Sequence, residues 1–159
     1  LRTSSAASDV YKRQEYFCCS NHRMFVEKNE KFFQKGFVLN STGLIGQIFR
    51  DHPNSHELIL LSDIDHKIPI YNKDFDIYCN AEGSGFERLI ICKSSKDLDK
   101  ESIIGQEFYT SGFGGVFNKD MPVGKAISFT QSENNEYEIS IEIFANPLTD
   151  ERVFLFQSA

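Results

Sequence analysis

The feature that most constrains the fold is a strict alternation of apolar and polar residues over Tyr137–Ile143. The odd-numbered residues are one tyrosine and three isoleucines, whereas the even-numbered residues are glutamate and serine. Successive side chains of a β-strand point to opposite faces, so this pattern predicts a half-buried strand. Other short apolar runs, rich in β-branched and aromatic residues, predict further strands at 23–27, 37–39, 44–49, 57–61, 67–71, 75–79, 88–92, 107–110, 123–129 and 152–156.

Turn signals separate these runs at short intervals, and examples are NSTG at 40–43, DHPNS at 51–55, EGSG at 82–85 and SENNE at 132–136. Short strands without a helix–strand rhythm predict an all-β barrel or sandwich. A polar stretch at 93–102 interrupts the pattern. We therefore expect two small β-units, residues 15–92 and residues 93–159. They should pack together, because units of this size bury little surface alone.

The first 14 residues are expected to be foreign to the protein. Residues 4–14 (SSAASDVYKRQ) resemble sequencing-adapter read-through at the start of metagenomic gene models, and fold reasoning excludes them. The formal net charge of the chain is −6, and residues 1–14 contribute +2, which leaves −8 for the remainder. Phosphate backbones attract clustered lysine and arginine, so this acidic balance argues against a nucleic-acid partner.

The four cysteines, Cys18, Cys19, Cys79 and Cys92, form no CxxC pair and no zinc-binding spacing. Small buried apolar side chains are the ordinary role of such cysteines. A Cys79–Cys92 bridge across a hairpin is the alternative in an oxidising compartment, and the sequence leaves both open. No apolar run of about 18 residues predicts a transmembrane helix in this sequence.

Ser111 opens the glycine-rich segment SGFGG, which is the most conspicuous candidate for chemistry. A serine nucleophile in a β-barrel hydrolase would need a base and an orienting carboxylate, for which His66 and Asp63 are the candidates. The Gly-Asp-Ser-Gly-Gly signature of such proteases is not kept, since Thr110 precedes the serine and Phe113 separates the glycines. The other interpretation is that these glycines supply positive φ angles or close backbone approach in a turn.

The histidines do not predict a metal site. His52 and His56 are four residues apart, which aligns two ligands only on a helix, and the intervening Pro53 and Asn54 favour a turn. The carboxylates on turns and in the polar stretch are predicted to be solvated. We therefore expect no metal, no cofactor and no catalytic residue.

Several motifs follow one another in a fixed order. TGLIGQ at 42–47 contains Gly43 and Gly46, an apolar strand ends in LLSD with Asp63, and an Ile-Pro-Ile step contains Pro69. In the second half, TSGFGGVF is followed by MPVGK, and the signature positions there are Thr110, Ser111, Gly112, Gly114, Gly115, Phe117, Pro122, Val123 and Gly124. This order resembles the rod shape-determining MreC family over nearly everything after residue 14.

Four positions depart from the family pattern. Phe113 replaces an aliphatic residue, Asn118 a proline, Asp120 a glycine, and Gln106 the aspartate of a Gly-Asp step. Asparagine at a turn tolerates much of what proline and glycine do there. Asp120 is expected to shift a loop and to leave the fold intact, whereas Gln106 leaves open the cap that the aspartate of the family would make.

The resemblance implies two small six-stranded β-barrels packed together at the periplasmic face of the bacterial inner membrane. It also implies a single-pass anchor and a coiled coil that this sequence does not include. The implied function is a non-catalytic scaffold of the cell-wall elongation complex, which maintains rod shape by binding and regulating the elongation-specific penicillin-binding transpeptidase. MreD, MreB and further copies of the protein, as a dimer or filament, are the other implied partners.

Phe144 is the candidate partner-contact residue. It lies on the opposite face of its predicted strand from the buried isoleucines, so exposure is expected, unless both faces are buried between the barrels. Two functions from other classes remain as alternatives. One is a serine hydrolase, or a degenerate relative of one, centred on Ser111. The other is a carbohydrate-binding barrel, which would need exposed aromatic platforms, and the absence of tryptophan argues against it.

Overall fold

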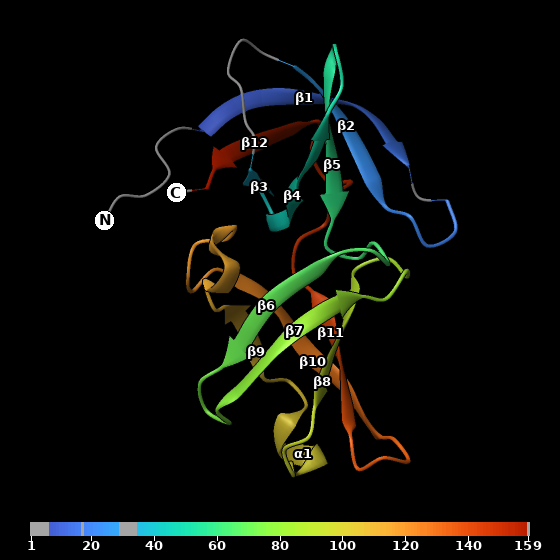
Figure 1. The fold of residues 1–159 in the computed structure, drawn as a ribbon, viewed down its shortest axis with the longest axis vertical. Helices are drawn as coiled ribbons and strands as arrows, with labels where there is room; N and C mark the ends of the chain where they lie inside the picture. Colours follow the sequence, from blue (N-terminus) through green and yellow to red (C-terminus); the bar gives the residue numbers. More distant parts are fainter. Residues whose placement is uncertain (1–6, 17, 29–34, 159) are drawn as a thin grey trace.

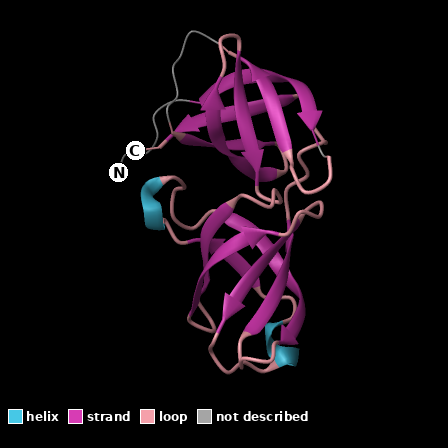
Figure 2. Cartoon of the chain, turned by 45° about the vertical axis from the view of Figure 1, so that its right-hand side comes forward, coloured by secondary structure: helices cyan, strands magenta, loops and turns pink. Residues whose placement is uncertain are grey.

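The structure is a computed structural model that describes residues 7–16, 18–28 and 35–158, and it is built almost entirely from strands (Figures 1 and 2). Its strands form two closed six-stranded barrels that lie one above the other along the longest axis of the molecule. Every neighbouring pair of strands is antiparallel. The predicted all-β class with two packed six-stranded barrels is confirmed.

The first barrel follows the strand order β1 (Ala7–Tyr16), β12 (Arg152–Gln157), β3 (Gly36–Asn40), β4 (Gly43–Asp51), β5 (Ser55–Leu60) and β2 (Arg23–Glu27). The second follows β10 (Pro122–Gln131), β11 (Tyr137–Ile143), β8 (Leu89–Ser94), β7 (Ile77–Gly83), β6 (Lys67–Asn72) and β9 (Glu107–Thr110). A short helix, α1 (Lys100–Ile103), and a 3-10 turn, η1 (Phe113–Gly115), complete the described elements.

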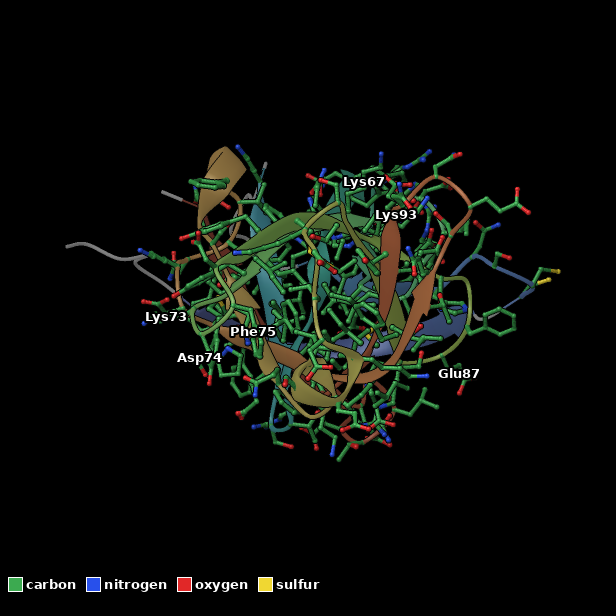
Figure 3. All side chains as sticks on the ribbon, turned by 90° about the horizontal axis from the view of Figure 1, so that it is seen from below. Lys67, Lys73, Asp74, Phe75, Glu87 and Lys93 are labelled. Atoms are coloured by element: carbon green, nitrogen blue, oxygen red, sulfur yellow. A yellow bond between two sulfur atoms is a disulfide. The ribbon has the colours of Figure 1, made fainter. Side chains whose placement is uncertain are left out.

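The alternation in β11 directs its isoleucines into the second barrel. Ile139 and Ile141 are fully buried and Ile143 nearly so, whereas Glu142 on the other face is exposed. Viewed along the long axis, charged side chains such as Lys67 project outward from the second barrel (Figure 3). The period-two pattern therefore identified both the strand and its buried face.

Strand pairing divides the chain differently from the expected boundary after residue 92. The strands β6 and β7 precede that boundary and β8 spans it, but all three belong to the second barrel, and β12 returns to the first barrel between β1 and β3. The polar stretch at 93–102 belongs to the second barrel, where it contains the end of β8 and the first three residues of α1. The chain thus crosses between barrels twice, at 61–66 and at 144–151. Each strand belongs to the barrel of the strands with which it pairs, and several of these strands are distant in sequence. Local composition therefore did not indicate where one barrel ends and the other begins.

Part of the segment expected to be foreign forms most of β1, which pairs with β12 and β2 and closes the first barrel. Strand pairing uses main-chain groups that every residue other than proline carries. Its position in the barrel therefore does not bear on its origin, and the foreign origin of residues 1–14 stays a prediction.

A disulfide joins Cys79 on β7 to Cys92 on β8, with 5.8 Å between their Cα atoms. The sequence left open whether these two cysteines are buried thiols or a disulfide, and in the structure they form the disulfide. The main-chain ladder between these strands is short, with Glu82 opposite Ile91 and Gly83 opposite Ile90. The bridge therefore holds the two strands together beyond the end of their ladder.

We expect the Cys79→Ala/Cys92→Ala double variant to unfold with a free energy lower by about 3 kcal/mol, because a cross-link between residues 13 apart restricts the unfolded chain. Urea unfolding followed by circular dichroism measures this change. A reductant should destabilise the parent protein by about the same amount, and it should have a much smaller effect on the double variant, in which only Cys18 and Cys19 remain. Equal unfolding midpoints for parent and variant would contradict the prediction.

Candidate interaction site at the joint between the barrels

The signature segment forms a closed loop at the end of β9. The buried Thr110 hydroxyl donates to the carbonyl oxygen of Asn118 and accepts from the N–H of Met121 at 2.9 Å. The Thr110 N–H donates to the Met121 carbonyl at 2.9 Å, and its carbonyl accepts from the N–H of Asp120 at 2.8 Å. One threonine therefore ties both ends of the loop at residues 111–120.

Left-handed backbone explains the residue types in this loop. Gly112 and Gly114 have φ angles of 83° and 81°, a region that glycine enters without steric cost. Asp120 has a φ of 69°, which accounts for the glycine that the family pattern has there. Aspartate is among the few residues that tolerate this conformation. Its carboxylate accepts a hydrogen bond from the Tyr71 hydroxyl, and this bond raises the pKa of Tyr71 to about 12.

Phe117 packs this loop of the second barrel against the first barrel. Its buried ring lies 6.3 Å from that of Phe37 on β3, and the His66 ring meets it edge-on at 6.1 Å. Phe37 in turn stacks on Phe156 of β12 at 5.2 Å. A signature residue of the second barrel therefore extends the aromatic core of the first.

Polar contacts support the same junction. The Lys35 Nζ donates to the carbonyl of Gly114 at 3.3 Å, and the Ser158 hydroxyl donates to the carbonyl of Val116 at 2.7 Å. Both donors flank strands of the first barrel, and both acceptors lie in the signature loop. The signature loop therefore holds the two barrels together on this side of the molecule.

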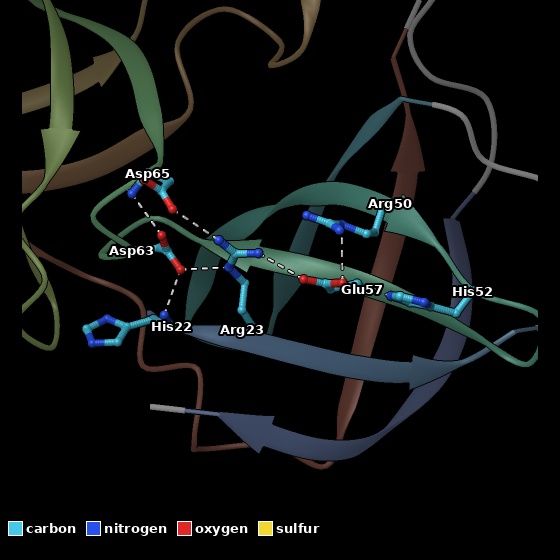
Figure 4. A network of polar contacts seen from close by, with 7 residues as sticks. All are labelled: His22, Arg23, Arg50, His52, Glu57, Asp63 and Asp65. Atoms are coloured by element: carbon cyan, nitrogen blue, oxygen red, sulfur yellow. Dashed lines mark hydrogen bonds and ion pairs between the residues drawn. The ribbon is translucent and has the colours of Figure 1, made fainter. Parts of the chain in front are cut away.

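On the other side, the crossover after β5 is organised by Asp63, a fully buried carboxylate (Figure 4). It accepts hydrogen bonds from Arg23 Nε at 2.7 Å, from the His22 N–H at 2.7 Å and from the Asp65 N–H at 2.8 Å. Burial alone would raise the pKa of Asp63, but these hydrogen bonds, led by that of Arg23, lower it on balance. The carboxylate thus stays charged and holds the crossover in one conformation.

Arg23 extends this network outward over the first barrel (Figure 4). Its guanidinium also contacts Glu57 at 2.9 Å, and Glu57 accepts from His52 at 2.8 Å. Burial would raise the pKa of Glu57, but the hydrogen bonds from His52 and Arg23 lower it on balance. The guanidinium groups of Arg23 and Arg50 each lie 4.3 Å from the centre of the Phe49 ring.

The end of β7 lies directly on the crossover. A Cβ atom at Gly83 would be 1.8 Å from the carbonyl oxygen of Asp63, a distance that no side chain can occupy. The Gly83 N–H donates to the His66 carbonyl at 3.0 Å, and the Gly85 N–H donates to the Ser62 carbonyl at 2.9 Å. The second barrel is therefore fixed to the crossover by main-chain contacts.

His66 is buried where the crossover enters the second barrel. Its Nε2 lies 2.8 Å from Oε1 of Gln47, whereas its Nδ1 has no hydrogen-bond partner within the described part of the chain. Burial lowers the pKa of His66 to about 4, against 6.5 for an exposed imidazole. The joint is therefore built around a neutral histidine.

Ser111, His66 and Asp63 do not form a catalytic triad. The Ser111 hydroxyl accepts from the N–H of Phe113 at 3.4 Å, and the hydrogen-bonded nitrogen of His66 is engaged with Gln47. The Asp63 carboxylate is occupied by Arg23 and two main-chain N–H groups. The geometry gives the hydrolase alternative no support.

The remaining signature residues also have structural positions. Gly46 and Gly124 each approach a neighbouring strand so closely that a Cβ atom would be 2.2 Å from a carbonyl oxygen. The others lie in turns or strands: Gly43 (φ 130°) opens β4, Gly115 (φ 71°) ends η1, Pro69 lies in β6, and Pro122 and the buried Val123 begin β10.

Beside the signature loop lies a row of rings, here named the aromatic strip: Phe113, Tyr78, Tyr71 and Tyr109. Phe113 and Tyr78 are exposed, Tyr109 is partly buried, and Tyr71 is buried beneath them. Tyr71 is paired with Tyr78 on one neighbouring strand and with Tyr109 on the other. Tyr78 stacks on Tyr71 at 5.5 Å and on Phe113 at 6.0 Å. Phe113 is 63% exposed and Tyr78 is 55% exposed, and a groove of about 470 Å³ adjoins them.

Sequence reasoning missed this strip. Its three tyrosines share one level of three adjacent strands, and only the register of strand pairing reveals this. In the sequence, Phe113 stands out only as a departure from the family pattern and from the protease signature. Phe144, the residue predicted to be exposed, follows β11 and is 37% exposed.

Among the described residues, no three or more histidine, cysteine, aspartate or glutamate side chains are grouped as a metal ion would require. No helix formed by those residues is long and apolar enough to span a membrane.

We expect Arg23→Met to lower the free energy of unfolding by about 3 kcal/mol, because it leaves the carboxylate of Asp63 buried without its charged partner. Chemical unfolding measures the change. Lys67→Met is the matched control, since Lys67 and Glu82 form an exposed ion pair that contributes about 0.5 kcal/mol or less. Equal effects of the two substitutions would contradict a special role for Asp63.

The buried His66 predicts a loss of stability in mild acid. Between pH 6.5 and about 4 the unfolded state binds a proton at this residue and the folded state does not, so stability falls as the pH is lowered. The total loss from this residue is about 3 kcal/mol. Unfolding free energies measured across this range should show a smaller decrease for His66→Gln. An unchanged slope would exclude His66 as its source.

A family model described as rod shape-determining protein MreC, barrel core, matches residues 28–157. The curated relative cell shape-determining protein MreC of Haemophilus influenzae is 31% identical over 112 residues. That alignment covers 70% of this chain, and the chain spans 30% of the length of that relative.

Solved structures share the fold. The major periplasmic domain of the cell shape-determining filament MreC aligns with all of this chain and 99% of its own, with a TM-score of 0.80 and 17% identity. MreC from Helicobacter pylori, in complex with penicillin-binding protein PBP2, aligns over 96% of this chain and 98% of its own, with a TM-score of 0.72 and 14% identity. The match to the family model and the relative from H. influenzae show, in agreement with the fold, that this chain belongs to the rod shape-determining protein MreC family and contains its barrel core.

Proposed function

We propose that the chain is the barrel core of a non-catalytic periplasmic scaffold that binds and regulates the elongation-specific penicillin-binding transpeptidase and so maintains rod shape. The observation that carries this proposal is the occurrence of a relative with the same fold in a complex with a penicillin-binding protein. A scaffold needs a fixed surface and no nucleophile. It regulates a partner by binding one of the partner's conformations more tightly than the other.

The surface that suits this role best is the aromatic strip. Protein interfaces concentrate their binding energy in exposed aromatic side chains that become buried in the complex. Tyr78 and Phe113 are held in place by ring stacking, so little side-chain freedom is lost on binding. The amino groups of Lys73 and Lys119 each lie 5.9 Å from the centre of the Tyr71 ring, which gives the strip a positive rim on an acidic protein. Such a rim favours a partner surface that combines apolar groups with carboxylates.

Phe144 is the second candidate contact, and it belongs to a different part of the surface. It immediately follows β11, where the Arg88 guanidinium donates to its carbonyl at 3.1 Å. Its lower exposure offers less area to a partner than the rings of the strip do.

The remaining parts of the proposal concern the longer protein. We propose that it is anchored in the inner membrane by a single span and that it also contacts MreD and MreB. Self-association as a dimer or filament is supported by a relative that is described as a filament.

The test is binding of the chain to the periplasmic part of the elongation transpeptidase from the same genome, measured by calorimetry. We expect Phe113→Asp and Tyr78→Asp each to weaken binding by at least about tenfold, the effect of a central interface residue. Phe86→Asp is the matched control, because Phe86 is an aromatic residue that is 72% exposed and lies outside the strip.

Each result has a definite meaning for the contact surface. Loss of binding with Phe144→Asp alone would move the interface to the end of β11. Equal weakening by the strip variants and Phe86→Asp would exclude the strip. Absence of binding by the folded parent chain would overturn the proposal that the barrel core itself recognises the transpeptidase.

A carbohydrate-binding barrel would need exposed aromatic rings, and the strip provides two, Tyr78 and Phe113, beside the polar residues Asn80 and Ser111. Titration with soluble peptidoglycan glycan strands, followed by tyrosine fluorescence, separates the two functions. The scaffold proposal expects no change in fluorescence. Saturable binding that Tyr78→Ser abolishes would favour the carbohydrate-binding function.

A further inference from the structure

Two adjacent cysteines, Cys18 and Cys19, lie exposed on the segment between β1 and β2. Their sulfur atoms are 3.0 Å apart, so the two side chains already point toward each other. Cys19 has a φ of 62°, and the N–H of Asn21 donates to the Cys18 carbonyl at 3.0 Å, which closes a turn around the pair. Both cysteines follow the segment that is expected to be foreign.

We propose that Cys18 and Cys19 are a reversible modification site, at which a disulfide-containing oxidant joins the two sulfur atoms within one chain. The thiolate of one cysteine attacks the disulfide of the oxidant, forms a mixed disulfide with one of its sulfur atoms and releases the other sulfur as a thiol. The second cysteine then attacks the sulfur of the first and releases the remaining half of the oxidant as a thiol. The pair gives up two electrons and two protons, and the oxidant takes up both.

Covalent geometry separates this pair from the Cys79–Cys92 bridge. The Cα atoms of adjacent residues are about 3.8 Å apart across a trans peptide, which is below the range of about 4.4–6.8 Å found in ordinary disulfides. The Cα atoms of Cys79 and Cys92 are 5.8 Å apart, inside that range. A bond between Cys18 and Cys19 is therefore strained and reducible, whereas the other bridge is structural.

The hydrogen bond between the two thiols raises the pKa of Cys19. Because the thiolate is the attacking species, the pair should be oxidised faster as the pH is raised. A metal ion is a poorer occupant, because the described part of the chain provides no further histidine, cysteine or carboxylate ligand grouped with the two sulfur atoms.

The position of the pair connects its redox state to the joint between the barrels. The Ser20 carbonyl accepts from the N–H of Ile64 in the crossover at 3.0 Å. The Ser20 side chain also lies 2.9 Å from the place of a Cβ atom at Gly85, in the turn between β7 and β8. Closing the ring at Cys18 and Cys19 changes the backbone that enters Ser20, and the contacts of Ser20 with both neighbours should respond.

The test uses the whole chain, equilibrated with mixtures of oxidised and reduced glutathione, alkylated and examined by peptide mass spectrometry. Under reducing conditions the peptide with Cys18 and Cys19 should carry two labels. Under oxidising conditions it should carry none and be lighter by two hydrogen atoms, with the chain still monomeric. The pair should open at a reductant concentration at least about tenfold lower than the Cys79–Cys92 bridge requires.

Cys18→Ser is the control, because its single remaining thiol can form only a mixed disulfide or a covalent dimer. At a reductant concentration that opens the pair and leaves Cys79–Cys92 closed, amide hydrogen exchange at Ile64 and Gly85 should differ between the oxidised and reduced parent protein. The same reductant concentration should leave this exchange unchanged in Cys18→Ser. The proposal is overturned if the oxidised parent forms dimers through these cysteines, keeps glutathione on them, or retains two thiols while Cys79–Cys92 is closed.

Discussion

The architecture depends on one buried charge, the carboxylate of Asp63, at the point where the chain leaves the first barrel. Arg23 and two main-chain N–H groups keep this carboxylate ionised and fix the crossover. The end of β7 then packs on the crossover backbone at a distance that only glycine permits. A buried ion pair adds little net stability when it replaces apolar packing, but removing one partner is costly. Its role here is to specify the path of the chain from one barrel to the next.

The signature loop has the same purpose on the opposite side of the joint. Thr110 closes the loop, its glycines adopt left-handed backbone, and Phe117 packs against Phe37 in the first barrel. The longest motif in the sequence is therefore explained by docking of two barrels, and Ser111 is a turn residue within it. A scaffold benefits from this arrangement, because a partner that contacts one barrel then meets a surface held in a fixed relation to the other.

Phe113 belongs both to the signature loop and to the aromatic strip, so it connects the contact between the barrels with the exposed surface. Stacking with Tyr78 holds this ring outward, while the loop that bears it is fastened to the first barrel. Binding at the strip would therefore be coupled to the relative position of the barrels by rigid contacts. The exposed cysteine pair directly precedes Ser20, which contacts the crossover on the opposite side of the same joint.

The sequence by itself determined the all-β class, the buried face of β11 and the family, because alternation and motif order are local properties of a chain. It also located the glycines and Asp63 that the joint requires, without showing what they contact. Tertiary structure alone decided that β6 to β8 belong to the second barrel, that β12 returns to the first, and that Cys79 and Cys92 are bonded. It likewise assembled the aromatic strip, whose tyrosines align only when three strands are in register. These features depend on pairing between distant segments, and closing a barrel selects among pairings that the local pattern leaves equivalent.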